Sequence, residues 1–298
     1  MRFLINILIG LFFLFTLYSC KDEPQRSEDF TAEFAFTAGI EGPAVNGNGE
    51  LFAVNFAREG TIGKVNKAGE GEVFISLPEG SIGNGIRFDL DGNMFIADYL
   101  GHKVYRIKKG TKVPEVWAQD STMNQPNDLA IGPEGVIYLS DPNWAESTGK
   151  LWMVSPEREI VLIEEGMGTT NGVEVSPDNK TLYVNESVQR VVWKYDILED
   201  GKLSNKKKFI NFTDFGLDGM RCDMQGNLYL TRYDKGTIAI VSPEGKILKE
   251  VLLKGKKPSN IAFGGEKGLN CYVTMADRGC LETFVALSPG SYYYKINR

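Results

Sequence analysis

Asn84-Gly85-Ile86-Arg87-Phe88-Asp89-Leu90-Asp91-Gly92-Asn93-Met94-Phe95-Ile96-Ala97 is a stretch that the chain repeats in outline six times. Each copy has a polar residue, a short apolar segment, a turn and a second apolar segment with an aromatic residue. The aromatic residues are spaced 43 to 46 residues apart, at Phe52, Phe95, Tyr138, Tyr183, Tyr229 and Tyr272. Because propeller blades repeat at about 40–50 residues, this period predicts six blades.

Two further strand-like segments follow each copy. After the second copy they are residues 104–107 and 113–117, and after the fourth they are residues 191–195 and 209–212. β-Branched and aromatic residues bounded by Gly, Pro, Asn and Asp are typical of strands and turns. No window shows a sustained helical period. We therefore predict an all-β fold, a six-bladed β-propeller with four antiparallel strands per blade.

The two ends of a propeller must pair to close the ring, because an unpaired blade would leave an open sheet edge. We expect residues 34–36, Phe-Ala-Phe, to complete the last blade beside residues 284–287. Residues 292–294, three consecutive tyrosines, are the alternative closing strand.

The first residues predict a lipoprotein signal peptide over residues 1–19. Arg2 precedes an apolar run, and Leu17-Tyr18-Ser19-Cys20 resembles a bacterial lipobox. The run is shorter than the ~20 residues that a transmembrane helix requires, so a membrane span is the weaker alternative. We expect lipidation of Cys20, a polar tether over residues 20–32 and the propeller over residues 33–298. The protein would then be anchored in the cell envelope, on the periplasmic face or at the cell surface.

Charge and cysteine content limit the partners. The net charge is −6 with no basic block, which argues against nucleic acid. We expect a monomer that meets the membrane only through its lipid anchor. Three cysteines remain after Cys20, and an odd number argues against a disulfide framework. Buried free thiols are expected at Cys222, Cys271 and Cys280, with a Cys271–Cys280 pair as the alternative.

Equivalent positions of the repeats carry a ring of polar residues. Eleven or twelve residues before each aromatic residue stands a short oxygen-bearing side chain: Glu41, Asn84, Asn127, Asn171, Asp218 and Asn260, the last one position out of register. Because the innermost strand of each blade lines the central channel, these side chains should face one another. Carboxylate and amide oxygens suit calcium, which takes ~6–8 oxygen ligands.

Other interpretations of this ring remain open. Asn, Asp and Gly are ordinary turn residues, and a repeat protein can reuse such turns without binding anything. That interpretation accounts poorly for Glu41, since Glu is not a turn former. Another divalent cation could replace calcium, whereas zinc and copper are disfavoured because the ring contains neither His nor Cys.

Several short motifs together resemble one known family. They are Glu41-Gly42-Pro43, Gln125-Pro126-Asn127-Asp128 with Ser140-Asp141-Pro142, Thr170-Asn171-Gly172, residues 217–223 around Asp218-Gly219, and residues 258–265 around Asn260. With these motifs the chain resembles the gluconolactonase, senescence-marker-protein and regucalcin family of calcium-dependent six-bladed propellers.

The resemblance implies a metal site and a hydrolase activity. It implies that Glu41, Asn171 and Asp218 are calcium ligands, with Asn127 as a fourth ligand or a substrate contact. It also implies that Asp218 acts as base or nucleophile in the hydrolysis of a small-molecule lactone or ester. Animal members of the family have an arginine where this chain has Gln125, so gluconolactone itself is less strongly implied than a lactone in general.

Further substrate contacts are expected around the ring. We expect Asn84 and Asn260 to contact substrate from the ring, and Trp144 and Arg232 to do so from the loops above it. His102, the single histidine, is interpreted as a polar surface residue, with an acid role as the alternative. A non-catalytic, calcium-pinned propeller that binds a carbohydrate or a partner protein is the main alternative function. An aryl-ester or phosphotriester hydrolase is the other.

Overall fold

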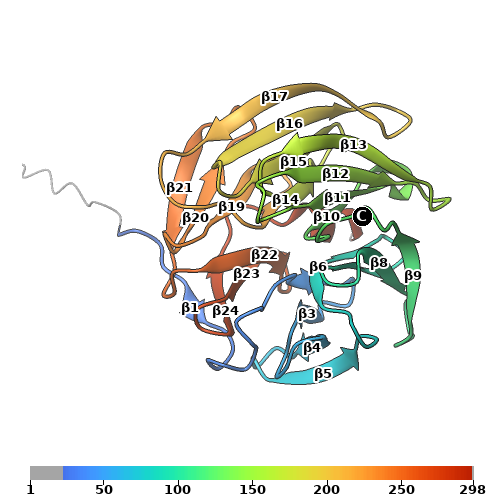
Figure 1. Ribbon diagram of the computed structural model, residues 1–298. Helices are drawn as coiled ribbons and strands as arrows, with labels where there is room; N and C mark the ends of the chain where they lie inside the picture. Colours follow the sequence, from blue (N-terminus) through green and yellow to red (C-terminus); the bar gives the residue numbers. More distant parts are fainter. Residues whose placement is uncertain (1–22, 297–298) are drawn as a thin grey trace, which may run out of the picture.

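Six four-stranded antiparallel sheets surround one axis in the computed structural model, which describes residues 23–296 (Figure 1). The predicted six-bladed β-propeller with four strands per blade is therefore confirmed. The predicted signal peptide and Cys20 lie outside the described residues.

The six blades follow the order of the sequence, except that the last blade takes its outer strand from the beginning of the chain. Blade 1 contains β2 (Ala44–Val45), β3 (Leu51–Val54), β4 (Thr61–Val65) and β5 (Gly71–Ser76). Blade 2 contains β6 (Gly83–Phe88), β7 (Met94–Asp98), β8 (Lys103–Ile107) and β9 (Pro114–Gln119). Blade 3 contains β10 (Leu129–Ile131), the 3₁₀ turn η1 (Pro133–Gly135), β11 (Ile137–Asp141), β12 (Gly149–Val154) and β13 (Ile160–Met167). Blade 4 contains β14 (Thr170–Val175), β15 (Thr181–Glu186), β16 (Val191–Ile197) and β17 (Leu203–Asn211). Blade 5 contains β18 (Met220–Cys222), β19 (Leu228–Arg232), β20 (Thr237–Val241) and β21 (Ile247–Leu252). Blade 6 contains β22 (Pro258–Gly264), β23 (Asn270–Met275), β24 (Cys280–Val285) and β1 (Glu28–Asp29), and the helix α1 (Ser291–Ile296) follows it.

The hydrophobic core lies between neighbouring blades. The aromatic residues that define the sequence repeat are all buried, because each stands on the second strand of its blade, between two sheets. The ring of Phe52 packs against that of Phe88 in the next blade, with 5.5 Å between ring centroids. Tyr229 and Phe263 make the same kind of contact at 4.9 Å. This packing explains why the repeat requires a large apolar residue at that position.

The ring is closed by a shorter and more polar strand than the sequence predicts. In β1, Glu28 pairs with Thr283 and Asp29 pairs with Glu282 of β24. The prediction that residues 34–36 form this strand is wrong: Phe34 and Phe36 instead donate backbone hydrogen bonds to the turn at Arg278 and Gly279. The tyrosine alternative is wrong too, because α1 contains those residues. Part of the segment predicted as a tether therefore belongs to the last blade.

An ionic cluster holds the closing strand in place. The Arg278 guanidinium lies 2.8 Å from the Asp29 carboxylate and 2.6 Å from that of Glu282, whose side chain is fully buried. The hydroxyl of Ser27 donates a hydrogen bond to the same Glu282 carboxylate. These contacts replace the apolar pairing that a longer strand would have supplied.

Arg278→Ala is expected to loosen the closed ring. The change leaves the buried Glu282 carboxylate without its cation, and a lost charged hydrogen bond costs about 1.5–3 kcal/mol of unfolding free energy. Urea unfolding followed by tryptophan fluorescence measures the loss. Arg58→Ala is the matched control, because Arg58 is exposed and reaches only the Ser76 hydroxyl. Equal midpoints for the two variants would contradict this role of Arg278.

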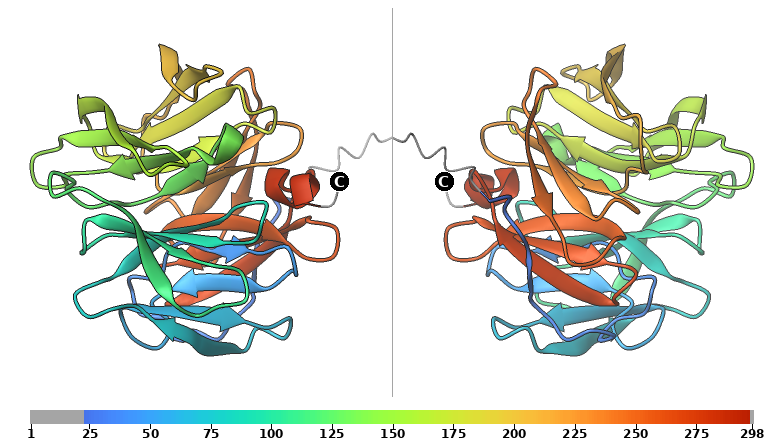
Figure 2. Two further views of the ribbon diagram at one scale, coloured as in Figure 1. Left: turned by 90° about the vertical axis from the view of Figure 1, so that its right-hand side faces the viewer. Right: turned by 90° about the vertical axis from the view of Figure 1, so that its left-hand side faces the viewer.

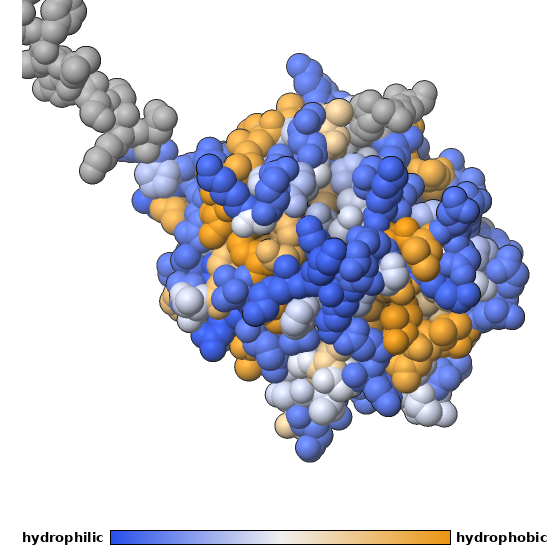
Figure 3. Space-filling view, turned by 90° about the horizontal axis from the view of Figure 1, so that it is seen from above, coloured by the Kyte–Doolittle hydropathy of each residue, from blue (hydrophilic) through white to orange (hydrophobic). Residues whose placement is uncertain are grey.

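The two faces and the outer edge of the disc differ in character. The helix α1 lies on one face, where the Tyr292 hydroxyl donates to the carbonyl oxygen of Asp89 at 3.0 Å (Figure 2). The edge seen in Figure 3 is mostly hydrophilic, with apolar patches between the polar groups.

Among the described residues, no helix is long and apolar enough to cross a membrane. Cys222, Cys271 and Cys280 are buried free thiols, as predicted.

Candidate active site

The polar residues of the repeat form a ring at the start of the six innermost strands. These strands, β2, β6, β10, β14, β18 and β22, contact one another around the axis. Hydrogen bonds tie the ring across blades: the Asn260 Nδ2 group donates to Glu41 Oε2 at 2.9 Å, and Asn185 of β15 donates to the Asp218 carbonyl at 2.5 Å. Glu41, Asn127, Asn171 and Asp218, which the family resemblance implies as ligands, all line one cavity at this ring.

Glycine follows four of the six ring residues because neighbouring blades approach too closely for a side chain. A Cβ atom on Gly219 would lie 2.0 Å from the Asn260 side chain. Gly42, with φ of +55°, would place a Cβ atom 2.0 Å from the carbonyl oxygen of Asn84. A side chain at either position would push adjacent blades apart, so the polar-residue–glycine pattern is a signature of the narrow channel.

A cavity of about 820 Å³ opens above the ring. Five of the ring residues line it, together with Trp144 and other residues from the turns above. Among the predicted site residues, those at the cavity are Glu41, Asn84, Asn127, Trp144, Asn171 and Asp218. Its volume falls in the ~300–1,000 Å³ range of small-molecule sites.

Two predicted substrate contacts do not line this cavity. Asn260 is fully buried, and both ends of its amide are occupied by Glu41 and Arg221. Arg232 is also buried, pairing with Asp214 at 2.7 Å and stacking on Phe212. His102 lies exposed in the turn between β7 and β8 and does not line the cavity either.

Three buried oxygen atoms of the ring have no hydrogen-bond donor. They are Glu41 Oε1, Asn127 Oδ1 and Asn171 Oδ1. An unpartnered buried acceptor costs about 1–3 kcal/mol, so three such atoms in one ring indicate a missing partner. A hard cation fits them, because calcium accepts carboxylate and amide oxygens together. Within residues 23–296, no group of three or more His, Cys, Asp or Glu side chains could hold a metal, and amides complete this ring instead.

Burial raises the pKa of both ring carboxyl groups. Burial and the charge of Glu41 hold the pKa of Asp218 well above its usual range. Burial and the charge of Asp128 raise the pKa of Glu41. Both shifts arise first from burial and then from a neighbouring negative charge, and a bound cation would oppose them.

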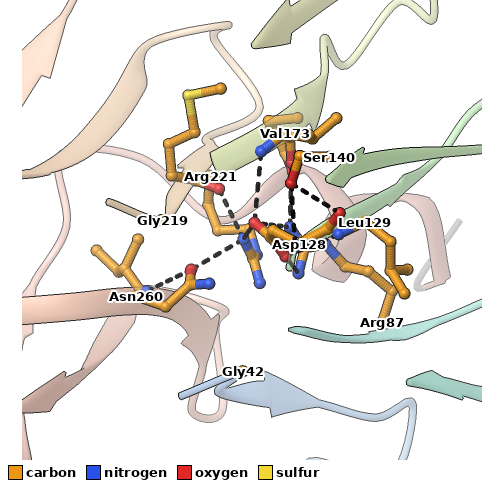
Figure 4. Close-up of polar contacts among 12 residues, drawn as sticks. Gly42, Arg87, Asp128, Leu129, Ser140, Val173, Gly219, Arg221 and Asn260 are labelled. Atoms are coloured by element: carbon orange, nitrogen blue, oxygen red, sulfur yellow. Dashed lines mark hydrogen bonds and ion pairs between the residues drawn. The ribbon is translucent and has the colours of Figure 1, made fainter. Parts of the chain in front are cut away.

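Next to the ring lies a second group of buried charges, and Figure 4 shows Asp128 between Arg87 and Arg221. Asp128 is fully buried and accepts hydrogen bonds from the Arg87 guanidinium, 2.9 Å from Oδ1, and from the backbone N–H of Leu129. Arg221 lies 3.5 Å from Asp128 and donates to Asn260 Oδ1 at 3.1 Å. Glu174 lies 3.8 Å from Arg87. We call Arg87, Asp128, Glu174 and Arg221 the ionic floor.

The balance of buried charges favours binding of a divalent cation at the ring. The ring and the ionic floor together contain four carboxylates, on Glu41, Asp128, Glu174 and Asp218, and two guanidinium groups. When all are ionised, two negative charges remain in a mostly buried region between the two cavities. Because uncompensated buried charge is costly, one divalent cation is the simplest neutralising partner.

The ionic floor was not predicted from the sequence, although a signal for it exists. Arg87, Glu174 and Arg221 each stand three residues after a ring residue. In a regular strand, residues three apart point to opposite faces, so this spacing alone does not predict a shared channel. Irregular pairing at the start of β6 and β14 turns both residues toward the axis.

Aromatic side chains surround the cavity mouth. Tyr99, Trp144, Phe215 and Tyr233 all line it, and Trp144 is 37% exposed and Phe215 46%. Burial and the nearby Asp218 carboxylate raise the pKa of Tyr233 to about 12, so its hydroxyl is a hydrogen-bond donor at neutral pH. A second cavity, of about 580 Å³, lies at the other end of the inner strands, beside α1.

These features define the class of protein: a six-bladed propeller whose channel carries one acid-and-amide ring below an open cavity. A sequence model of the SMP-30/Gluconolactonase/LRE-like region matches residues 40–277. The chain belongs to this family.

Individual relatives are consistent with this membership. The gluconolactonase of Zymomonas mobilis is 31% identical over 216 residues, which cover 64% of this chain and 60% of that enzyme. The diisopropyl-fluorophosphatase of Loligo vulgaris is 26% identical, covering 76% of this chain and 82% of that one. The solved structure of regucalcin from Agrobacterium tumefaciens, described as a calcium-binding protein, has a TM-score of 0.76 at 19% identity, covering 88% and 94% of the two chains. The alignment spans less than two thirds of the gluconolactonase's own length, and both curated relatives are named as hydrolases.

Proposed function

We propose that this protein is a calcium-dependent lactonase that acts at the cavity above the polar ring. The observation that carries the proposal is the set of unpartnered oxygens on Glu41, Asn127 and Asn171 beside the half-buried Asp218 carboxylate. These four residues would hold the cation. The cavity above them gives a small ester access to the same place.

The chemistry divides between the metal and this chain. A calcium ion held by the ring would polarise the lactone carbonyl as a Lewis acid and stabilise its developing negative charge. Asp218 serves as general base: its carboxylate takes a proton from the attacking water as the new carbon–oxygen bond forms. The ring carbon–oxygen bond then breaks, and the same proton passes to the departing alkoxide. Asn171, hydrogen-bonded to Asp218, keeps that carboxylate oriented.

A panel of substrates tests this proposal. Sugar lactones, alkyl lactones, aryl esters and phosphotriesters are each offered to the protein with calcium and with excess EGTA. We expect lactone hydrolysis that the chelator abolishes and added calcium restores. Absence of turnover of every substrate by calcium-loaded protein would favour a non-catalytic propeller in which calcium only stabilises the fold.

A phosphotriester or aryl ester is the second candidate substrate. The relative named diisopropyl-fluorophosphatase aligns over more of both chains than the gluconolactonase does. Phosphoryl and carbonyl oxygens are both hard ligands that a calcium ion can polarise. The same panel separates the two activities through their ratio of kcat/KM.

We also propose that the propeller is tethered to a membrane through a lipid on Cys20, which lies outside the described residues. Cys20→Ser should move the protein from the membrane fraction to the soluble fraction and abolish incorporation of labelled palmitate. Ser19→Ala is the matched control, because it keeps a small residue before the cysteine and should stay in the membrane fraction. Cys20→Ser protein that remains in the membrane fraction would overturn the anchor.

A further inference from the structure

The mouth of the cavity carries a chemical preference of its own. We infer that the substrate is a neutral lactone with an apolar alkyl or aryl substituent, rather than a polyhydroxylated or anionic sugar lactone. This inference rests on the proposed lactonase function. It is carried by the side chains around the mouth, which take no part in the ring or the ionic floor.

Apolar groups gather at the mouth from several blades. Trp144 comes from the connection between β11 and β12, Phe215 precedes β18, and Val188 lies in the turn between β15 and β16. Their side chains are 37%, 46% and 57% exposed. A single exposed apolar residue is ordinary, but several around one cavity indicate a surface that awaits an apolar ligand. Tyr99 and Tyr233 extend this surface down toward the ring.

The charges at the mouth disfavour an anion. Glu59 and Asp234 line the cavity in addition to the two ring carboxylates. Among the described residues that line it, Arg190 is the one cation, and its guanidinium already donates to the Thr213 carbonyl at 3.2 Å. Four carboxylates against one guanidinium leave the cavity negative even with a divalent cation bound. An anionic sugar lactone would meet repulsion there without a free partner.

The three most exposed side chains of the mouth offer a hydroxyl group no hydrogen-bond partner, although polar groups such as Ser187 and Glu59 line other parts of the cavity. Arg232, at the end of β19, is buried against Phe212 and paired with Asp214, so it is not available to a polar substrate. A sugar ring stripped of water against Trp144, Phe215 and Val188 would lose hydrogen bonds that these side chains cannot replace. An alkyl or aryl group has no hydrogen bonds with water to lose, and it gains contact area with these side chains.

A homologous series of δ-lactones tests the inference on the calcium-loaded protein. The series runs from δ-valerolactone through δ-hexanolactone and δ-octanolactone to δ-decanolactone, with glucono-1,5-lactone and 6-phosphogluconolactone as polar and anionic probes. Each methylene group buried at the mouth should raise kcat/KM by up to about fourfold. The value of kcat/KM should therefore rise along the series until the cavity is filled. We expect δ-decanolactone to exceed both sugar lactones by at least tenfold.

Two variants separate the mouth from the ring. Trp144→Ala and Phe215→Ala should each reduce the preference for δ-decanolactone over δ-valerolactone severalfold, mainly through KM. Phe34→Ala is the matched control, because Phe34 is 77% exposed and does not line the cavity. A flat series with normal turnover of glucono-1,5-lactone would overturn the inference and leave the lactonase proposal standing.

A binding measurement covers the remaining case. If no lactone is hydrolysed, the lactonase proposal fails, and calorimetry with δ-decanolactone and glucono-1,5-lactone then measures the preference of the mouth directly. The inference requires tighter binding of δ-decanolactone, weakened by Trp144→Ala. Equal or weaker binding than glucono-1,5-lactone would overturn it.

Discussion

Calcium binding and lactone hydrolysis are both expected to be lost in Glu41→Gln and Asp218→Asn. Each change replaces a carboxylate of the ring by a neutral amide of nearly the same shape, so the ring keeps its packing but loses half of its negative charge. Calcium affinity depends strongly on the number of charged ligands, and we expect the Kd to rise by on the order of 100-fold or more. Asp218→Asn also removes the general base, which is worth about 10²–10⁴ in kcat.

Three measurements separate these effects from unfolding. Titration calorimetry with calcium gives the Kd, lactone hydrolysis at saturating calcium gives kcat, and thermal melting of the calcium-free proteins gives stability. Burial and neighbouring carboxylates raise the pKa of both carboxyls, so the calcium-free variants should melt no lower than the unaltered protein. Glu72→Gln is the matched control, an exposed glutamate on β5. Hydrolysis that survives Asp218→Asn unchanged at saturating calcium would exclude Asp218 as the base.

The fold could be predicted because its signal is repeated six times. Each aromatic residue of the repeat fills the space between two sheets, and each ring residue starts an inner strand, so the same physical demand recurs at a fixed spacing. Asn171 is offset by one residue because its turn is longer, and the structure still places it at the cavity. Errors in single strands therefore did not change the architecture.

The closing strand could not be predicted because apolar periodicity does not hold it. Glu28 and Asp29 form a strand of two residues with no alternating pattern. What fixes Asp29 is charge, from Arg278 and from the Lys254 ammonium group at 2.6 Å. Phe34 attracted the prediction because aromatic residues favour strands, yet its side chain is among the most exposed apolar groups of the described residues.

The substrate contacts show a related limit. Arg232 was predicted as a substrate contact because it lies near the mouth of the cavity in sequence order. A guanidinium with a carboxylate and an aromatic ring beside it is, however, more stable buried than exposed. Phe212 ends the fourth copy of the repeat and Arg232 belongs to the fifth, so nothing within one copy reveals that Arg232 is engaged. Pairings that cross from one blade to the next become visible only in three dimensions, and the ionic floor is of the same kind.

Asp128→Asn is expected to destabilise the protein more than any other single change to the ionic floor. The carboxylate is fully buried and holds both Arg87 and Arg221. The amide would present N–H donors to two guanidinium groups and leave their charge uncompensated. Breaking a buried ion pair in this way costs about 3–5 kcal/mol. Urea unfolding should show the loss, whereas Asp200→Asn, which removes an exposed ion pair with Lys202, should leave the midpoint unchanged.

A charge-restoring variant distinguishes electrostatics from packing. Asp128→Asn lowers the buried excess of negative charge from two to one, so calcium affinity should fall together with stability. Adding Arg221→Met removes one guanidinium and returns the excess to two, and the double variant should regain part of both. If the second change only adds to the damage, the ionic floor acts through its packing and not through its charge. Recovery of calcium affinity with the double variant would instead establish that the floor sets the charge that the cation neutralises.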